Sequence, residues 1–414
     1  MIIKKFLNLD YFPIFIIAVL PISLLISTGV SELTVILLVI TFLLHSIYKN
    51  NFLWVKNEYF ILLSVLWASL IANYFFSLNS SLSFSRSFGF IKYIIFVFAI
   101  NHYLRIKKNL NFILLLWLII CLIVSCDIFF EYLNKKNILG FYSNDPTRIA
   151  SFLGKELKIG HFIIGFGFIA IGYFYENHLN KSKYSIYVGY CLIIFLISSL
   201  ILTGERSNTI KGIIGITLFF LFSKHIFFVK KKKIYLLLLI FFLTSLFYFS
   251  DRIKGRFNTI INPILDQGLS KSFKETQHAA HYYTAIEIFK SYPLFGVGNK
   301  NFREECNKEK YYNESYAWTA QRCTTHPHQI YLELLSEHGL IGACIIIFVI
   351  FFSLYKSIKI FYKKKKVVHL SSILFIIITF LPIIPSGSFF TSWGATIFWI
   401  NYSIMIFYNN SLNK

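Results

Sequence analysis

The segment SIYVGYCLIIFLISSLILT, residues 185–203, contains no charged side chain. A run of about 20 mainly apolar residues is long enough to cross the hydrocarbon core of a bilayer as a helix. Similar runs recur from one end of the chain to the other. The 414 residues are 56% hydrophobic and only 14% charged, whereas soluble domains are about 25% charged. The sequence therefore predicts an all-α integral membrane protein.

The apolar runs predict about twelve transmembrane helices. They cover residues 11–27, 31–48, 58–77, 84–104, 110–132, 159–176, 185–203, 207–228, 234–249, 329–354, 368–385 and 392–408. Two connections are longer than the others, at 133–158 and 250–328. The chain is thus expected to contain a first group of spans in residues 1–249, a large loop at 250–328, and the last spans in 329–414.

The positive charge follows the pattern of a membrane protein. The formal net charge is +22, and lysines gather in short connections such as Lys230–Lys233 and Lys363–Lys366. Lys and Arg are enriched in cytoplasmic loops. This rule places both termini and the lysine runs in the cytoplasm, and the loops 133–158 and 250–328 on the outer side. Since membrane orientation accounts for the charge, membrane lipids are expected as neighbours and nucleic acid is not.

The large loop is predicted to contain a helix followed by a turn. SKSFKETQHAAHYYTAIEIFKSY is expected to form an amphipathic helix, with Ala280, Tyr283, Ile286 and Phe289 on its apolar face. In PLFGVGNKNF, the residues after it, proline and glycines interrupt the helical period. We therefore expect a small extramembrane subdomain here.

Cysteines fall in two environments. Four of the six lie in predicted spans, where cysteine behaves as a small apolar residue. Cys306 and Cys323 both lie in the large loop. In an oxidising compartment they can form a disulfide, but the sequence alone leaves open whether they pair or remain free.

Several basic residues lie toward the outer side, where short segments normally avoid them. Arg86 and Lys92 belong to the fourth predicted span, and Arg206 and Lys211 surround the start of the eighth. Cations in this position suggest an anionic ligand near the outer leaflet. The alternative is that these long side chains extend to the membrane surface without binding a ligand.

Arg206 has the most suggestive setting, in LTGERSNTI. Gly204 ends one span, and Ser207 or Asn208 can cap the next, so the guanidinium is expected beside a helix N-terminus. Such a terminus already favours anions, and an arginine there can bind a phosphate with two hydrogen bonds. Arg148, in YSNDPTRIASFLG, follows a similar turn, although it can also be an ordinary loop arginine.

The segment TTHPHQIYLELLSEHGLIG, residues 324–342, places two histidines before an apolar run. Pro327 suits the first turn of a helix, so the tenth span is predicted to begin near His328. The helix dipole disfavours a cation there and keeps the imidazole neutral, as a general base requires. His326 or His328 can instead have a structural role. No metal site is predicted, because no Cys or carboxylate stands nearby at a metal-binding spacing.

These residues carry a family resemblance. Residues His328 to Gly342 fit the pattern H-[NSQ]-x9-G-x-x-[GTY], with Gly339 at its first glycine. This pattern resembles the O-antigen ligases, which share a superfamily with the O-antigen polymerases. PLFGVGNKNF resembles the turn that precedes the catalytic segment in that superfamily, and TGERSNTI resembles its arginine-bearing short loop. Ile210 departs from the leucine that often stands four residues after this arginine, which exchanges one apolar residue for another.

The resemblance implies a metal-independent, inverting membrane glycosyltransferase that needs no cofactor. It would move a glycan from undecaprenyl pyrophosphate to the lipid A-core oligosaccharide, at the periplasmic face of the bacterial inner membrane. His328 is then expected as the base, and Arg206 and Arg148 as catalytic groups at the diphosphate. The expected substrate-binding residues are Lys211, Arg86, Lys92, His326 and Gln329.

Two alternatives differ from this assignment. An O-antigen polymerase uses the same lipid-linked donor but often carries an Arg-x10-Gly element, and no arginine of this chain has a glycine eleven residues later. A secondary transporter also fits twelve spans with both termini inside. Transporters, however, place their sites near the membrane midplane between related halves, whereas the charges here lie toward the outer side.

The predicted topology is testable by labelling. A cysteine placed at Ser270 should react with a membrane-impermeant reagent added from outside, because residues 250–328 are expected there. A cysteine placed at Lys364 should react only after the membrane is opened. The opposite pattern would invert the orientation and move the expected site to the cytoplasm.

Overall fold

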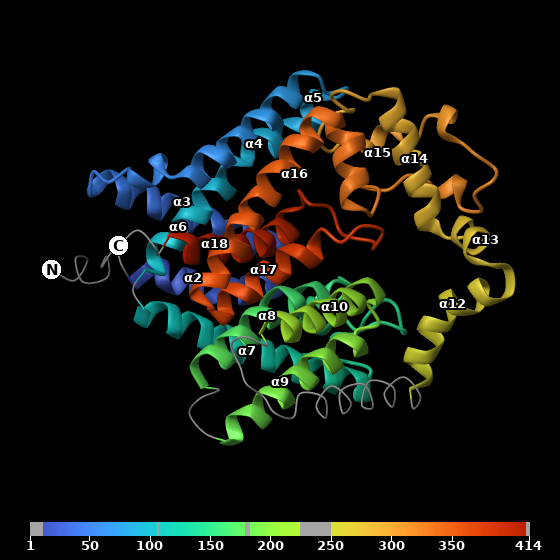
Figure 1. Ribbon diagram of the computed structural model, residues 1–414. Helices are drawn as coiled ribbons and strands as arrows, with labels where there is room; N and C mark the ends of the chain where they lie inside the picture. Colours follow the sequence, from blue (N-terminus) through green and yellow to red (C-terminus); the bar gives the residue numbers. More distant parts are fainter. Residues whose placement is uncertain (1–10, 106, 179–182, 224–249, 411–414) are drawn as a thin grey trace.

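Helices dominate the computed structural model (Figure 1). The described residues are 11–105, 107–178, 183–223 and 250–410. No β-strand occurs in these ranges, and seven of their helices are long and apolar enough to cross a membrane. This architecture agrees with the predicted integral membrane protein. The predicted span at 234–249 and the Lys230–Lys233 run lie outside the described residues, so the number of about twelve spans stays a prediction.

A helix or helix pair occupies the position of each predicted span in the described ranges. They are α2 (Tyr11–Ile26), α3 (Thr28–Tyr48), α4 (Glu58–Phe75), α5 (Ser80–Gly89), α6 (Ile91–Tyr103), α7 (Lys107–Asn134), α8 (Ile159–His178), α9 (Lys183–Leu202), α10 (Arg206–Ser223), α16 (Ile330–Lys364), α17 (Val367–Thr379) and α18 (Ser392–Asn410). Three differ from expectation. Helix α16 continues to Lys364, beyond the predicted end of its span at residue 354. Residues 84–104 belong to two helices, α5 and α6, and the span predicted at 368–385 ends at Thr379. Pro382 explains the early end, because it cannot donate the next helical hydrogen bond and its ring clashes with the preceding turn.

Helix α8 lies at the centre of the bundle, packed against α7, α9, α17 and α18 (Figure 1). Its glycines allow the neighbouring helices to approach closely. A Cβ at Gly165 would lie 2.3 Å from Cγ2 of Ile397, and one at Gly172 would lie 2.4 Å from Oγ of Ser371. Small residues serve this purpose at helix interfaces in membranes.

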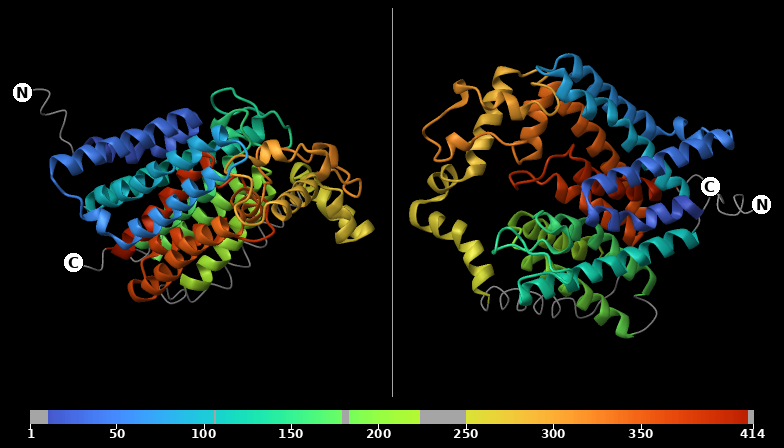
Figure 2. Two further views of the ribbon diagram at one scale, coloured as in Figure 1. Left: turned by 90° about the horizontal axis from the view of Figure 1, so that it is seen from above. Right: turned by 180° about the vertical axis from the view of Figure 1, so that it is seen from behind.

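Residues 250–328 form a subdomain at one end of the bundle (Figure 2). It contains α12 (Asp251–Gln267), α13 (Leu269–Lys274), α14 (Gln277–Ser291), α15 (Phe302–Glu305) and two short 3-10 helices, η3 (Glu309–Tyr311) and η4 (Thr319–Gln321). A disulfide joins Cys306 to Cys323. The pairing that the sequence left open is thus made, and it closes the loop just before the His-Pro-His segment.

The single helix expected before PLFGVGNKNF is divided. Thr276 caps the start of α14 by accepting a hydrogen bond from the Ala279 N–H, which separates α14 from α13. The expected apolar face was also wrong in part, since Ile286 is 40% exposed while Thr284 and Ile288 are buried. Packing of α14 against α16 decides which face is covered.

Helix α16 is interrupted at Gly339, and the PLFGVGNKNF turn forms hydrogen bonds with the backbone groups that the interruption leaves without helical partners. Gly339 has φ 62° and ψ −170°, so the helical ladder stops there. The turn supplies the missing partners: the N–H of Val297 donates to the Ser336 carbonyl at 2.9 Å and the N–H of Leu340 donates to the Pro293 carbonyl at 2.8 Å. Backbone groups at a buried break need such partners. The two motifs noted in the sequence therefore form one hydrogen-bonded unit.

Two buried glutamates in the first half of α16 hold flanking loops. Glu337 accepts hydrogen bonds from the N–H groups of Lys300 at 2.8 Å and Phe302 at 3.2 Å. Glu333 accepts from the Phe389 N–H at 2.9 Å and from the Ser388 hydroxyl. One helix face thus fixes both the loop after the turn and the loop between α17 and α18.

Substitution of Gly339 tests this arrangement. A Cβ there would lie 2.3 Å from the Leu294 carbonyl oxygen, and the residue's backbone region is almost restricted to glycine. Gly339→Ala should therefore lower the free energy of unfolding by at least about 1–3 kcal/mol, measured as a loss of thermal stability of the purified protein. Gly255→Ala is the control, because a Cβ there meets nothing within 4 Å. Equal stability of the two variants would refute the proposed constraint.

Candidate functional site

A cavity of about 480 Å³ opens at the end of the bundle that carries the 250–328 subdomain. Its walls come from helix ends and the loops beside them: the starts of α8, α10, α16 and α18 and the end of α17, with contributions from α12 and α14. Its polar lining residues include Arg148, Lys158, His161, Glu205, Arg206, Asn208, Lys211, Arg256, His278, His326, His328, Ser386, Ser388 and Thr391. Segments far apart in sequence therefore meet in one basic, histidine-rich cavity.

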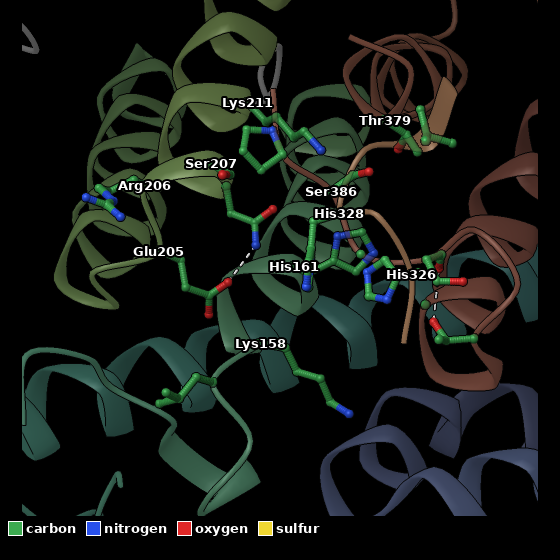
Figure 3. A pocket seen from close by; sticks show the side chains of 18 of the residues that line it. Lys158, His161, Glu205, Arg206, Ser207, Lys211, His326, His328, Thr379 and Ser386 are labelled. Carbon is green, nitrogen blue, oxygen red and sulfur yellow. Dashed lines mark hydrogen bonds between the residues drawn. The ribbon is translucent and has the colours of Figure 1, made fainter. Parts of the chain in front are cut away.

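Three histidines, His278, His326 and His328, line one wall of the cavity, and His281 packs beside His328. The ring centroid of His328 lies 4.2 Å from that of His326, 5.3 Å from that of His281 and 5.7 Å from that of His278. His328 is partly exposed, whereas His326 is buried. Figure 3 shows the side chains of His326, His328 and His161 on one side of the cavity, with Glu205 and Arg206 on the other.

The local structure at His328 differs from the expected helix start. Helix α16 begins at Ile330, and the Gln329 side chain caps it by accepting from the Leu332 N–H at 2.8 Å. His328 precedes the helix with φ 58°, a left-handed conformation, and its carbonyl accepts from the Ser386 N–H at 2.8 Å. Pro327 therefore does not occupy the first helical turn. Gln329 completes the helix end instead of lining the cavity.

The neutral state expected of His328 has a different cause from the one proposed from the sequence. The pKa of His328 is lowered to about 4, mainly by burial and in addition by the neighbouring His281 and His278. Burial also lowers the pKa of His278 to about 4. Burial first, and the neighbouring imidazoles second, therefore disfavour the cation at His328.

Three arginines converge on the wall opposite the histidines. Burial lowers the pKa of Arg148, the negative charge of Glu205 raises it, and the positive charge of Arg256 lowers it. Arg206 donates to the Arg256 carbonyl at 3.3 Å and to the Thr259 hydroxyl at 3.0 Å. The guanidinium of Arg206 thus links α10 to α12, and in Figure 3 it is turned away from His328.

Glu205 is the carboxylate that lines this cavity, and its oxygens are already bonded. It accepts from the Gly160 N–H at 2.7 Å and from the Asn208 amide at 2.6 Å. Burial raises the pKa of Glu205 to about 6, although these two hydrogen bonds and Arg148 oppose the shift. One acidic group that faces three arginines leaves an excess of positive charge, as an anion-binding site requires.

Lys211 and Lys158 add to this charge. The Lys211 side chain is 5% exposed and lines the cavity, where it reaches from α10 toward the histidines (Figure 3). The Lys158 ammonium lies 4.6 Å from the ring centroid of Trp393. The ring of His161 lies beside the same indole, with ring centroids 5.9 Å apart.

Two of the residues expected from the sequence lie elsewhere. Lys92 forms an ion pair with Glu32. Arg86 is in α5, close enough to the buried Glu333 and Glu337 of α16 for its charge to attract theirs. Neither lines the cavity. The ion pair of Lys92 indicates a structural role, and the charge of Arg86 interacts with carboxylates of α16 outside the cavity.

The sequence did not single out Arg256, His278, Lys158 or His161. Arg256 and His278 come from the large loop, whose docking onto the bundle depends on tertiary contacts. Lys158 and His161 flank the start of α8, and a histidine just inside a span is itself a signal of function. Among the described residues, no three His, Cys, Asp or Glu side chains are grouped so as to hold a metal ion.

The fold and the cavity define a multi-pass membrane protein with a cationic, histidine-lined site at one end of its helix bundle. Residues 191–347 match the family model described as O-antigen ligase, which supports membership of the O-antigen ligase superfamily. The resemblance drawn from the sequence motifs is thereby confirmed. Members of this family are glycosyltransferase-like enzymes of O-antigen processing. No curated protein matches the chain.

The protonation state of His328 is testable directly. Because its pKa is lowered to about 4, the imidazole should stay neutral at pH 6, where a histidine of ordinary pKa is largely protonated. Nitrogen chemical shifts of labelled histidine, assigned by comparison with His328→Gln, report this state. A titration midpoint near pH 6.5 would show that burial and the neighbouring histidines do not control this group.

Proposed function

We propose that the protein is an O-antigen ligase, which transfers a glycan from undecaprenyl pyrophosphate to the lipid A-core oligosaccharide. The observation that carries the proposal is the pairing, across one cavity, of a partly exposed neutral imidazole at His328 with a cluster of arginines. The family match supports an O-antigen ligase or polymerase. The donor, the acceptor and the periplasmic location of the cavity belong to the proposal.

The cationic wall would bind the diphosphate of the donor. Arg148, Arg206 and Arg256 line the cavity together, and the nearby Glu205 has its oxygens occupied. When the bond between the sugar and the diphosphate breaks, the electron pair leaves with the diphosphate. Positive groups fixed in advance stabilise this developing charge without reorganisation.

His328 would accept the proton of the acceptor hydroxyl. The hydroxyl oxygen attacks the anomeric carbon from the side opposite the diphosphate, so the configuration at that carbon inverts. A base with a pKa near 4 is weak, but bound negative charge raises the pKa of a neighbouring imidazole. The donor would thus strengthen the base that its own reaction needs. No metal ion or cofactor is required for these steps.

Replacement of the imidazole tests the base. His328→Ala should lower the transfer rate by about 10²–10⁴-fold, the usual contribution of general acid–base catalysis, while donor binding is retained. His326→Ala should cost much less, because His326 is buried and bonds Thr325 at 2.9 Å. Transfer and donor affinity in reconstituted membranes measure both effects. A normal rate for His328→Ala, or a loss of affinity equal to the loss of rate, would exclude His328 as the base.

Replacement of Arg206 tests the anion site. Arg206→Ala should weaken donor binding about ten- to hundredfold, since a hydrogen bond to a charged group contributes about 1.5–3 kcal/mol. Arg206→Lys should recover little, because one ammonium cannot hold Thr259 and a phosphate together. Arg105→Ala serves as the control, because Arg105 is exposed and does not line the cavity. Full donor affinity in Arg206→Ala would show that Arg206 does not bind the donor and only connects α10 to α12.

A further inference from the structure

Helix α12 carries an apolar stripe that begins inside the protein and continues outside it. Ile253 is buried, and Phe257 packs against the core of the bundle. The next apolar residues on the stripe, Ile260, Ile261 and Leu265, are 41%, 42% and 77% exposed. Apolar residues at such spacing normally face a packed partner. Within the described residues, the protein covers the first part of this stripe and leaves the second part exposed.

Hydrogen bonds place α12 where membrane helices end. At its start, the Ser250 hydroxyl is 2.7 Å from the hydroxyl of Tyr132, in the last turn of α7. Further along, Thr259 accepts from Arg206, the first residue of α10. Helix α7 contains a membrane-length apolar stretch. In Figure 1, α12 runs along the right-hand edge, crosswise to α7 and α10.

We propose that α12 lies in the plane of the membrane surface on the cavity side, with Ile260, Ile261 and Leu265 in the boundary between lipid headgroups and acyl chains. A helix anchored at the ends of two bundle helices, and crosswise to them, lies at the depth where the bilayer interface begins. Interfacial helices have a polar face and an apolar face of this kind. The stripe therefore continues from the protein core into lipid.

The other faces of α12 agree with this placement. Asn262 and Asp266 are exposed. At about 100° per residue, Asp266 lies about 140° round the helix from Ile261, and Asn262 lies about 160° from Ile260. We assign these two polar side chains to water. Lys254 stands two turns before Ile261 on the same side, where a long side chain reaches lipid phosphates while its methylene groups stay apolar. The stripe lies at the level where α7 ends and α10 begins, which is the level expected for the bilayer interface. We therefore assign the stripe to lipid and not to a second protein chain.

The inner face of α12 connects this lipid contact to the cavity. Arg252 donates to the Arg148 carbonyl at 2.7 Å, and Arg256 donates to the Gly204 carbonyl at 3.4 Å. The loops that carry Arg148 and Arg206 are thus tied to the helix that rests on the membrane. The inference depends on the membrane fold and is independent of the proposed glycan transfer.

Photocrosslinking in a bilayer tests the proposal. The full-length protein, with a small diazirine amino acid at Ile261 or at Asp266, is reconstituted in vesicles of phosphatidylethanolamine and phosphatidylglycerol and illuminated. Lipid adducts, measured by mass spectrometry, should be about tenfold or more abundant for position 261, because only that side faces the acyl chains. Ile260 and Asn262 give a second pair with the same expectation.

Equal lipid adducts within both pairs would overturn the proposal, as would adducts to a second copy of the chain at 261 and 260. All four side chains are exposed, so the replacements disturb no buried contact. The readout is lipid proximity and not transfer. A failure here leaves the proposed function untouched, and an inactive protein can still give the expected adducts.

Discussion

The exchange of hydrogen bonds at Gly339 is the constraint on which the candidate site depends. Breaking a helix beside the membrane leaves backbone groups without partners, which is costly where water is scarce. The turn at Pro293–Gly298 supplies those partners, and so fixes the end of α14 and the loop after it against α16. His278, on α14, and His328, just before α16, are brought to one cavity by this arrangement.

Glu333 and Glu337 extend the same constraint to the other walls. Each carboxylate accepts two hydrogen bonds from a flanking loop. Glu333 positions the loop that includes Ser386 and Ser388, and the Ser386 N–H in turn binds the His328 carbonyl. The cavity therefore combines a histidine wall held by these hydrogen bonds with an arginine wall formed by the loop before α8, the first residue of α10 and helix α12.

Much of this arrangement could be predicted from the sequence, for physical reasons. Apolar runs predicted the spans, because a helix that crosses lipid must be apolar. Arg206 and Lys211 were proposed because cations on the predicted outer side are unusual, and Arg148 because it follows a turn like that of Arg206. Arg256 was missed because its place depends on how α12 docks. Arg86 was expected at the substrate, but in the structure it lies near the glutamates of α16. The sequence could not show this proximity, because it arises only when α5 packs in the folded bundle.

The central claim is that this cavity joins a lipid-linked glycan to a lipid A-core acceptor. The most direct measurement supplies the purified protein, in a bilayer, with an undecaprenyl-pyrophosphate-linked glycan and lipid A-core oligosaccharide, and identifies the products by mass spectrometry. The account predicts glycan attached to the lipid A core, with release of undecaprenyl pyrophosphate. Longer glycan on the lipid carrier, formed whether or not the lipid A core is present, would contradict it and identify a polymerase.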